Sequence, residues 1–361
     1  REIHQRMKFA ILNDTHAGVR SDMVEMSEYQ GRFYNEVFFP YMEENDITHI
    51  VHLGDYFDRR KYINFATMKA NIKHFIEPMT EKGFTMDLIL GNHDTYYKST
   101  NDVNAPQLLL FNEANINVIT EPCINEYDGF NIAMVPWINP ENYADTVDFL
   151  RTAEASWCMG HFEFEGALMM PGMTCQHGFD HSYVKRFEKV LSGHFHQKFE
   201  FSNIRYLGSQ MQFTWSDYGD QKYFHVFDTD TQELTPVLNP LTMFEKAFYD
   251  DTNESFETIA NADYSKYQGK FTKVIVVNKD NPYWFDTFLD KIHAESPLHV
   301  SVVDDNKHMD FFEDDDIEDV EDTLTILSKY VDSLDIQGKK KPLNDIMQSL
   351  YNEALDEHTF L

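Results

Sequence analysis

Five short apolar runs in the sequence each lead into residues that can bind a metal ion. Such runs are typical of buried parallel strands, whose carboxyl ends meet at one edge of an α/β sheet, where ligands bind. The run at residues 47–52 leads into Leu53-Gly54-Asp55. The other four lead, in chain order, into Asp14-Thr15-His16, Gly91-Asn92-His93-Asp94, Gly160-His161 and Gly193-His194-Phe195-His196. We therefore predict that these side chains form one cluster.

The spacing within two of these segments suggests how their side chains are directed. Residues two apart in a strand point to the same side, so Asp14 with His16, and His194 with His196, should each face one site together. A Gly-Asp pair after a single strand is more often an ordinary turn. Asp55 is predicted to be a metal ligand because four other runs also lead into metal-binding residues. His49 and His52 are instead predicted to be core histidines with satisfied hydrogen bonds.

Length and charge limit the function classes. A chain of 361 residues can bury a large core and form about two domains. The formal charge of −31 opposes non-specific attraction to nucleic acid or to anionic membranes. Any contact with DNA must therefore be local, metal-assisted or shared with a partner. No apolar run approaches the roughly 20 residues that span a membrane, so a soluble protein is predicted.

Cysteine usage points away from disulfides. The three cysteines lack C-x-x-C spacing, which indicates neither a disulfide framework nor a thiolate zinc site. A reducing cytoplasm is the predicted environment. Met7 resembles a natural start, so residues 1–6 are left out of the fold interpretation.

The apolar periodicity predicts alternating strands and helices over the first two thirds of the chain. Strands at 8–12, 47–52 and 85–90 alternate with helices at 29–44 and 64–79, which indicates right-handed βαβ units. Further strands are expected at 117–119, 130–137, 155–159 and 190–192, and further helices at 104–114 and 141–153. Residues 168–180 are predicted to be an irregular loop. Strands at 204–207, 223–227 and 233–238 are expected to complete a second sheet.

The remaining third has a different character. A strand at 271–277, a helix at 283–293 and a strand at 298–303 suggest a small accessory β-α-β unit. Residues 304–322 hold eleven acidic residues and are predicted to be a solvated linker. Two helical stretches, 317–334 and 343–355, carry apolar side chains on one face.

The predicted cluster suits a particular chemistry. Two divalent ions about 3.5–4 Å apart can share one bridging carboxylate, bind a phosphate oxygen each and generate hydroxide between them. Asp55 is the candidate bridge. Imidazoles, carboxylates and one amide oxygen, without a thiolate, favour Mn²⁺, Fe or Zn²⁺.

The segments follow the order of five known motifs. D-x-H stands at residues 14–16, G-D-x-x-D at 54–58, G-N-H-D at 91–94, G-H at 160–161 and G-H-x-H at 193–196. With these motifs, residues 7–238 resemble the calcineurin-like metallophosphoesterase superfamily. The resemblance implies an α/β fold, a two-sheet metallophosphoesterase sandwich flanked by helices, with a small α+β capping domain and a C-terminal helical hairpin.

The resemblance also implies roles for the site residues. One metal would be held by Asp14, His16, Asp55 and His196, and the other by Asp55, Asn92, His161 and His194. His93 would contact the scissile phosphate and protonate the leaving oxygen. Asp58 is a second catalytic candidate, at a position where archaeal and eukaryotic members tend to carry His. Arg59 and Lys61 are candidates for phosphate contact, although Arg59-Arg60-Lys61 could equally be a solvated loop face.

Within the superfamily, the chain is most similar to the nuclease subunits of double-strand-break repair complexes, the SbcD or Mre-type family, and among them to the recombination endonuclease subunits of T-even-like phages. The likeness lies in Gly54-Asp55-Tyr56-Phe57-Asp58, Val135-Pro136-Trp137 and the segment from Ser192 to His196. It implies a Mn²⁺-dependent exonuclease or endonuclease that processes DNA ends in recombination, repair or replication, in the host cell cytoplasm if phage-encoded. The implied partners are DNA, a coiled-coil ATPase of the SbcC/Rad type and a second copy of the chain.

On this reading the chain divides into four parts. A nuclease domain at 7–240 is followed by a capping, DNA-binding domain at 241–303, the acidic linker at 304–322 and an ATPase-binding helical segment at 323–361. Two alternatives remain. The same metals would serve a phosphoprotein phosphatase or a small-molecule phosphodiesterase, although protein phosphatases usually read G-D-x-V-D-R-G and G-N-H-E. An assembly subunit with a vestigial site would not need the unbroken ligand set.

Overall fold

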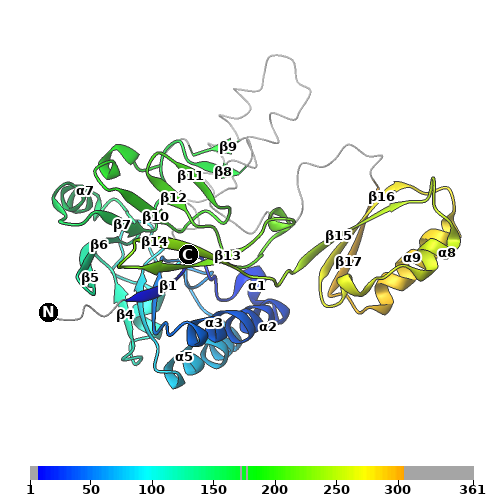
Figure 1. The fold of residues 1–361 in the computed structure, drawn as a ribbon, viewed down its shortest axis with the longest axis horizontal. Helices are drawn as coiled ribbons and strands as arrows, with labels where there is room; N and C mark the ends of the chain where they lie inside the picture. Colours follow the sequence, from blue (N-terminus) through cyan, green and yellow to red (C-terminus); the bar gives the residue numbers. More distant parts are fainter. Residues whose placement is uncertain (1–6, 171–172, 176–177, 305–361) are drawn as a thin grey trace, which may run out of the picture. The chain divides into compact units, whose positions relative to one another are not determined.

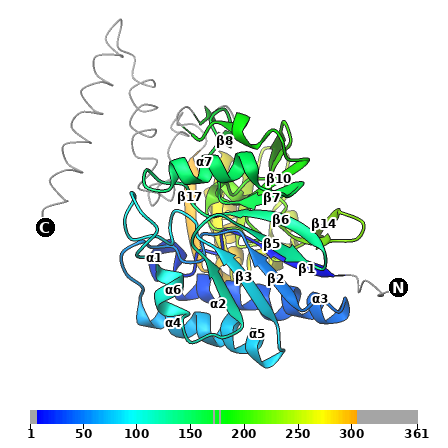
Figure 2. The same cartoon turned by 90° about the vertical axis from the view of Figure 1, so that its left-hand side faces the viewer.

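The computed structural model of the chain describes residues 7–170, 173–175 and 178–304. Most of these residues form two six-stranded sheets with helices on both outer sides, as Figure 2 shows. The predicted two-sheet sandwich is therefore confirmed, whereas the acidic linker and the C-terminal helices lie outside the described residues, because residues 305–361 are not among them. None of the described helices combines the length and the apolar character needed to cross a membrane.

The first sheet has the strand order β14-β13-β1-β2-β3-β4. Its strands are β1 (Lys8–Leu12), β2 (His49–His52), β3 (Thr85–Ile89), β4 (Ile116–Ile119), β13 (Tyr223–Asp228) and β14 (Glu233–Leu238). Strands β1 to β4 are parallel, and β13 runs antiparallel to both β1 and β14. The expectation that the last two strands belong to the second sheet is wrong. They extend the first sheet instead, where the rings of Phe227 and Phe9 pack 5.3 Å apart.

The second sheet has the order β11-β12-β10-β7-β6-β5. Its strands are β5 (Cys123–Tyr127), β6 (Phe130–Val135), β7 (Trp157–Gly160), β10 (Lys189–Ser192), β11 (Phe199–Phe201) and β12 (Ile204–Tyr206). Strand β5 was not predicted. It forms a hairpin with β6 across Asp128 and Gly129, whose φ angles of 50° and 79° are those that a two-residue type I′ turn requires. An Asp-Gly pair between two runs is the sequence signal for that turn.

Side chains from both sheets form the core between them. In each strand alternate residues face inward, as the period of two requires. The buried members of this core are Phe9, Ile11, Val51, Leu53, Ile89, Ile119, Tyr127, Ile132, Met134, Trp157, Met159, Leu191, Leu207 and Phe227. This packing fixes the two sheets against each other, and with them the strand ends that carry the candidate ligands.

Two long helical runs cover the outer face of the first sheet. They are α2 (Val24–Arg32), η1 (Phe33–Phe38) and α3 (Phe39–Glu44), and α4 (Phe65–Asn71), η2 (Ile72–Ile76) and α5 (Glu77–Glu81). Helix α7 (Tyr143–Thr152) covers the second sheet from the other side (Figure 2). Buried aromatic rings such as Phe39 and Phe75, 5.7 Å apart, join the two runs.

The short elements differ more from the predictions. They are α1 (Val19–Asp22), α6 (Ala105–Leu109), η3 (His181–Val184), η4 (Trp215–Asp217) and the hairpin strands β8 (Leu168–Met170) and β9 (Met173–Thr174). The helix predicted at 104–114 is shortened to α6, since Phe111 is 76% exposed and gives no packing that would extend it. The hairpin lies within the span that was predicted to be irregular.

A third sheet follows the sandwich in the chain. Its strands β15 (Phe244–Asp250), β16 (Phe271–Asn278) and β17 (His299–Asp304) are all parallel, and β15 was not predicted. Helices α8 (Phe256–Asn261) and α9 (Pro282–Ala294) pack on one face of this sheet, and η5 (Ser265–Tyr267) follows α8 (Figure 1). The unit has its own buried core, which includes Tyr249, Val274 and Phe288. The four domain boundaries stay predictions.

The histidines of β2 have structural partners, as predicted. His49 Nε2 lies 3.2 Å from Asp87 Oδ2, and His52 Nε2 lies 3.0 Å from the Thr15 hydroxyl. Asp87 also accepts a hydrogen bond of 2.7 Å from the Tyr127 hydroxyl. Burial works to raise the pKa of Asp87, but these hydrogen bonds outweigh it and lower that pKa. Both imidazoles therefore serve the packing of the first sheet.

Candidate metal centre

The candidate ligands converge at the carboxyl ends of five strands, β1, β2, β3, β7 and β10. Three groups of side chains have ligand atoms that all lie within 4.8 Å of one another. The groups are Asp14, His16 and His196; Asp55, His161 and His194; and His16, Asp58 and His93. The candidate side chains therefore lie close together in the structure, and they come from both sheets.

The backbone of this cluster is strained. Asp14, His16, Asp55 and His194 have φ angles of 48°, 45°, 55° and 90°. Residues other than glycine seldom adopt this left-handed region, and residues with such backbone strain are common at functional sites. The four residues stand in tight turns just beyond the strand ends. The strand-alternation rule therefore does not explain their directions, although His194 and His196 both face the cluster, each in a different group.

Two glycines allow the turns to approach each other closely. Gly54 has a φ of 90°, and a Cβ there would lie 2.7 Å from the main-chain nitrogen of Gly91. A Cβ on Gly91 would lie 2.1 Å from Asp55 Oδ1. A larger residue at Gly91 would displace Asp55, and one at Gly54 would collide with Gly91 and the His161 ring, which explains the glycine at these two positions.

The first group is held by its backbone as well as by its side chains. The main-chain N–H of His194 donates to both carboxylate oxygens of Asp14, at 3.0 and 3.1 Å. The Nε2 atoms of His16 and His196 lie 3.0 Å apart. Two ring nitrogens at this distance either share a proton or both face a cation.

Asp55 lies between the groups. Its Oδ2 is 3.8 Å from His16 Nε2 and 3.3 Å from His161 Nε2, and its Oδ1 accepts a hydrogen bond of 2.8 Å from the His93 main-chain N–H. The residue is 1% exposed. A carboxylate this close to histidines of both groups lies where a ligand shared by two ions would have to lie.

The second group includes an amide oxygen. Asn92 Oδ1 lies 2.9 Å from His161 Nε2 and 3.0 Å from His194 Nδ1. His161 Nδ1 donates to the main-chain carbonyl of Leu53 at 2.7 Å, which fixes the ring so that Nε2 faces the site. The assignment of these residues to two separate ions stays a prediction.

His93 and Asp58 lie beside the two groups. His93 Nδ1 donates to the main-chain carbonyl of Asp58 at 2.6 Å, because a carbonyl oxygen can only accept. The side chain of Asp58 is 23% exposed, and its Oδ1 lies 3.3 Å from His16 Nδ1. Asp58 therefore contacts both the candidate acid and a candidate ligand.

The two cationic candidates differ in their surroundings. Arg59 Nη1 lies 3.2 Å from Asp22 Oδ2, and the guanidinium stacks over the ring of Tyr62. Its charge is therefore compensated by Asp22 of helix α1. Lys61 is exposed to solvent.

The electrostatics of the cluster fit divalent cations. Burial alone would lower the pKa of His16 and of His161, but the surrounding carboxylates raise it, to about 10 and about 9. Burial and neighbouring imidazoles lower the pKa of His194 to about 3. Burial would raise the pKa of Asp55, yet His161 and other imidazoles hold it well below its usual range. Imidazolium groups thus balance the buried carboxylates. Divalent cations would take over this role, because ligation needs neutral imidazoles.

Several residues that support the site were not predicted. Asp94 accepts hydrogen bonds from the main-chain N–H groups of Tyr56, Phe57 and Gly91 at 2.9 to 3.1 Å, and burial raises its pKa to about 6. Asn13 donates to Asp14 Oδ2 at 2.6 Å. Asp94 stands inside the G-N-H-D motif and Asn13 directly before the D-x-H motif, so their neighbours in the sequence were the available signal.

Two further supports lie outside the five ligand motifs, and of these Trp137 stands in the segment Val135-Pro136-Trp137 that the family likeness had marked. Gln30 Nε2 donates to the main-chain carbonyl of Thr15 at 2.6 Å, from a helix that the sequence offers no reason to single out. The ring of Trp137 lies 5.5 Å from that of His194.

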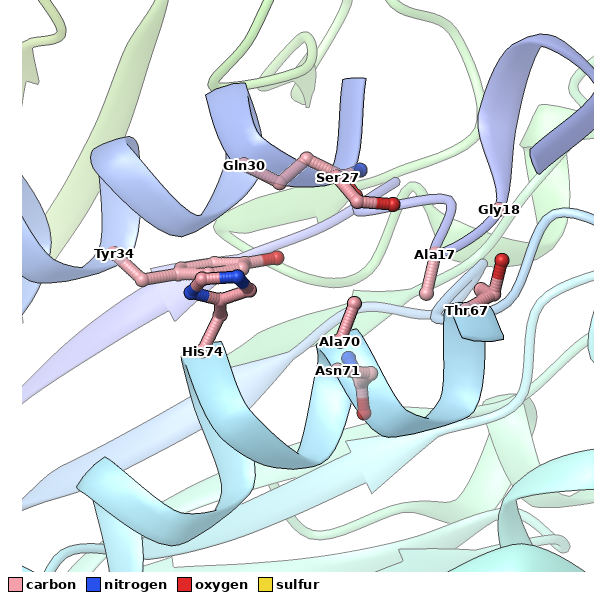
Figure 3. A pocket seen from close by; sticks show the side chains of 9 residues that line it. All are labelled: Ala17, Gly18, Ser27, Gln30, Tyr34, Thr67, Ala70, Asn71 and His74. Atoms are coloured by element: carbon pink, nitrogen blue, oxygen red, sulfur yellow. The ribbon is translucent and has the colours of Figure 1, made fainter. Parts of the chain in front are cut away.

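A small pocket lies beside the loop that follows His16. Figure 3 shows it between α2 and α4, where its lining includes Gln30, Tyr34, Asn71 and His74. Its volume of about 10 Å³ is room for about one water molecule. None of the candidate ligands lines it, so it is not the metal site.

Comparison with known proteins gives a consistent answer. The family model described as calcineurin-like phosphoesterase matches residues 7–198, more than half of the chain. Exonuclease subunit 1 of Enterobacteria phage T4 is 31% identical over 353 residues, which cover 96% of this chain and 99% of that protein. A solved structure of a novel archaeal phosphodiesterase covers 64% of this chain and 100% of its own at 12% identity. Its TM-score of 0.32 is too low to support any statement on this chain.

Proposed function

The chain belongs to the calcineurin-like phosphoesterase family, and on that basis we propose that it is a Mn²⁺-dependent DNA nuclease, the catalytic subunit of a nuclease–ATPase complex. Membership confirms the predicted superfamily, the fold class and a metal-dependent hydrolase. The choice of DNA as substrate is supported by the phage relative, which is named an exonuclease subunit and matches nearly the whole chain. That match is the observation that carries the proposal, because it extends well beyond the phosphoesterase motifs.

The proposed ligands are those of the first two groups. Asp14, His16, Asp55 and His196 would hold one ion, and Asp55, Asn92, His161 and His194 the other. Two bound divalent ions would polarise the phosphate and lower the pKa of a bound water molecule. The residues of the chain would hold the ions at the ends of packed strands, which would orient a bound phosphodiester before the reaction begins.

His93 is proposed to protonate the leaving oxygen. Its Nδ1 carries the proton that is donated to the Asp58 carbonyl, which makes Nε2 the nitrogen that exchanges a proton with the substrate. Asp58 fixes this tautomer through its main chain, and its side chain orients His16. Arg59 and Lys61 are proposed phosphate contacts.

The substrate class can be tested with one panel. Purified protein with Mn²⁺ is incubated with end-labelled duplex DNA, with a phosphopeptide and with bis-p-nitrophenyl phosphate. We expect cleavage of the DNA, slower cleavage of the small diester and no turnover of the phosphopeptide. Preferred turnover of the phosphopeptide would contradict the nuclease proposal and favour a phosphatase. Repeating the DNA assay on metal-stripped protein with Mn²⁺, Mg²⁺ or Zn²⁺ tests the proposed choice of Mn²⁺.

The acidic charge of the chain makes help with DNA binding necessary. We propose that residues 241–303 form a capping domain that guides duplex DNA, that the ATPase is of the SbcC/Rad coiled-coil type, and that two copies of the chain act in the complex. Residues 323–361 are the proposed ATPase-binding segment, because residues 343, 346, 347, 350, 354 and 355 are apolar at helical spacing.

Truncation after Asp316 tests the proposed partner. The truncated chain should keep Mn²⁺-dependent cleavage of DNA, since every proposed ligand is retained, but should lose ATPase binding and ATP-stimulated processive degradation. Pull-down of the ATPase measures the first loss, and product length in the presence of ATP measures the second. Binding of the ATPase at the affinity of the full chain would show that the segment has another role.

A further inference from the structure

A buried lysine lies directly behind one of the proposed ligands. Lys222 precedes β13, and its side chain is 2% exposed. Its ammonium group lies 2.6 Å from Asp217 Oδ1 and 3.0 Å from Asp220 Oδ2. It also donates to the main-chain carbonyl of His196 at 3.0 Å. Burying an ammonium group costs several kcal/mol unless it is paired and hydrogen-bonded, so this arrangement needs a reason.

The His196 carbonyl is the structural link to the site. It accepts hydrogen bonds from Lys222 Nζ and from the main-chain N–H of Ser209, both at 3.0 Å. These two donors fix the peptide on which the His196 ring is carried. The ring nitrogen Nε2 then faces His16 Nε2 at 3.0 Å.

The partner of Lys222 holds a second contact with the same imidazoles. Asp217 Oδ2 accepts a hydrogen bond of 2.8 Å from the main-chain N–H of Phe213. The ring of Phe213 packs edge-on against both His16 and His196, at centroid distances of 5.8 and 5.6 Å. One buried ion pair thus fixes the main chain of His196 and the ring that supports both imidazoles.

We propose that Lys222 is a positioning residue that holds His196 for the ion bound by Asp14, His16 and His196. The inference rests on the proposed metal-binding role of His196. It concerns one of the two ions only, because His161, a proposed ligand of the other ion alone, is held separately by the Leu53 carbonyl. Loss of residues that orient ligands typically lowers metal affinity about 10–100-fold.

Two variants separate the effect of Lys222 on the position of His196 from its effect on the stability of the folded protein. Lys222→Met leaves the Asp217 carboxylate buried without its ammonium partner, so it should lower the melting temperature. Adding Asp217→Asn removes that unpaired charge and keeps an oxygen for the Phe213 N–H, so the double variant should recover most of the lost melting temperature. Neither variant restores the hydrogen bond to the His196 carbonyl.

Metal affinity is the deciding measurement. Mn²⁺ is titrated into metal-free protein and followed by isothermal calorimetry and by the electron paramagnetic resonance signal of free Mn²⁺. In the double variant we expect one of the two ions to bind about 10–100-fold more weakly and the other to bind as in the wild type. Wild-type affinity for both ions in the thermally recovered double variant would overturn the proposal, as would an equal loss for both ions.

Lys198→Met is the matched control. Lys198 stands two residues from His196, and its ammonium lies 4.1 Å over the ring of Tyr223, so this variant removes the same charge nearby without touching the His196 carbonyl. It should bind both ions with wild-type affinity. Weaker binding of an ion by this variant would show that the loss of a nearby positive charge causes the effect, and it would overturn the proposal. Failure of the wild-type chain to bind two ions would instead count against the proposed function itself.

Discussion

Asp55→Ala should abolish cleavage of DNA and lower the number of Mn²⁺ ions bound per chain from two to none. The reason is that the Asp55 carboxylate lies within 4 Å of an imidazole nitrogen from each of the two ligand groups. Two cations about 4 Å apart repel each other, and a shared negative ligand is what lets them bind together. Inductively coupled plasma mass spectrometry of dialysed protein gives the metal count, and an end-labelled duplex gives the rate.

Asp87→Asn is the control for that variant. Asp87 is also a buried carboxylate of the first sheet, but its partners are His49, Asn117, Asn125 and Tyr127 rather than the cluster. It should lower the melting temperature and leave two bound ions. If Asp55→Ala retained both ions and normal cleavage, the two-metal account would be wrong.

His93→Ala should keep the metal pair and lose about 10²–10⁴-fold in the rate of DNA cleavage, as expected for a general acid that is not itself a ligand. Its side chain is held by the Asp58 carbonyl, and its main-chain N–H donates to Asp55, a contact that alanine retains. Single-turnover kinetics with saturating Mn²⁺ measure the effect.

The leaving group provides the control for His93. p-Nitrophenolate is a stable anion and needs no proton in order to depart, so the variant should lose much less rate with bis-p-nitrophenyl phosphate than with DNA. Equal losses on the two substrates would show that His93 binds the phosphate rather than protonating the leaving oxygen. Loss of metal from the variant would show that His93 has a structural role instead.

The site could be predicted from the sequence because its ligands stand at the ends of apolar strands. Asp55 and His161 are recognisable by the runs before them, and parallel strands bring such ends together whatever the loops do. The directions of the side chains could not be predicted in this way. Asp14 and His194 adopt left-handed turns, where the alternation of a strand no longer applies, and only contacts distant in sequence stabilise such strain.

The supports of the site and the order of the strands needed the fold. Gln30 and Lys222 reach the site from other parts of the chain through hydrogen bonds to main-chain carbonyls, and no local pattern marks such residues. The apolar residues of strand β13 would suit either of the two sheets. Its pairing with β1 depends on which sheet has an edge strand free to pair with it. Strand β15 was missed because Glu245 and Lys246 interrupt its apolar pattern.

Crystals grown with Mn²⁺ and measured at the manganese absorption edge would show whether Asp55 bridges two divalent ions at the strand ends. We expect two anomalous peaks about 3.5–4 Å apart, with Asp55 between them, one beside Asp14, His16 and His196 and the other beside Asn92, His161 and His194. A single peak, or two peaks that Asp55 does not join, would rule out this bridge.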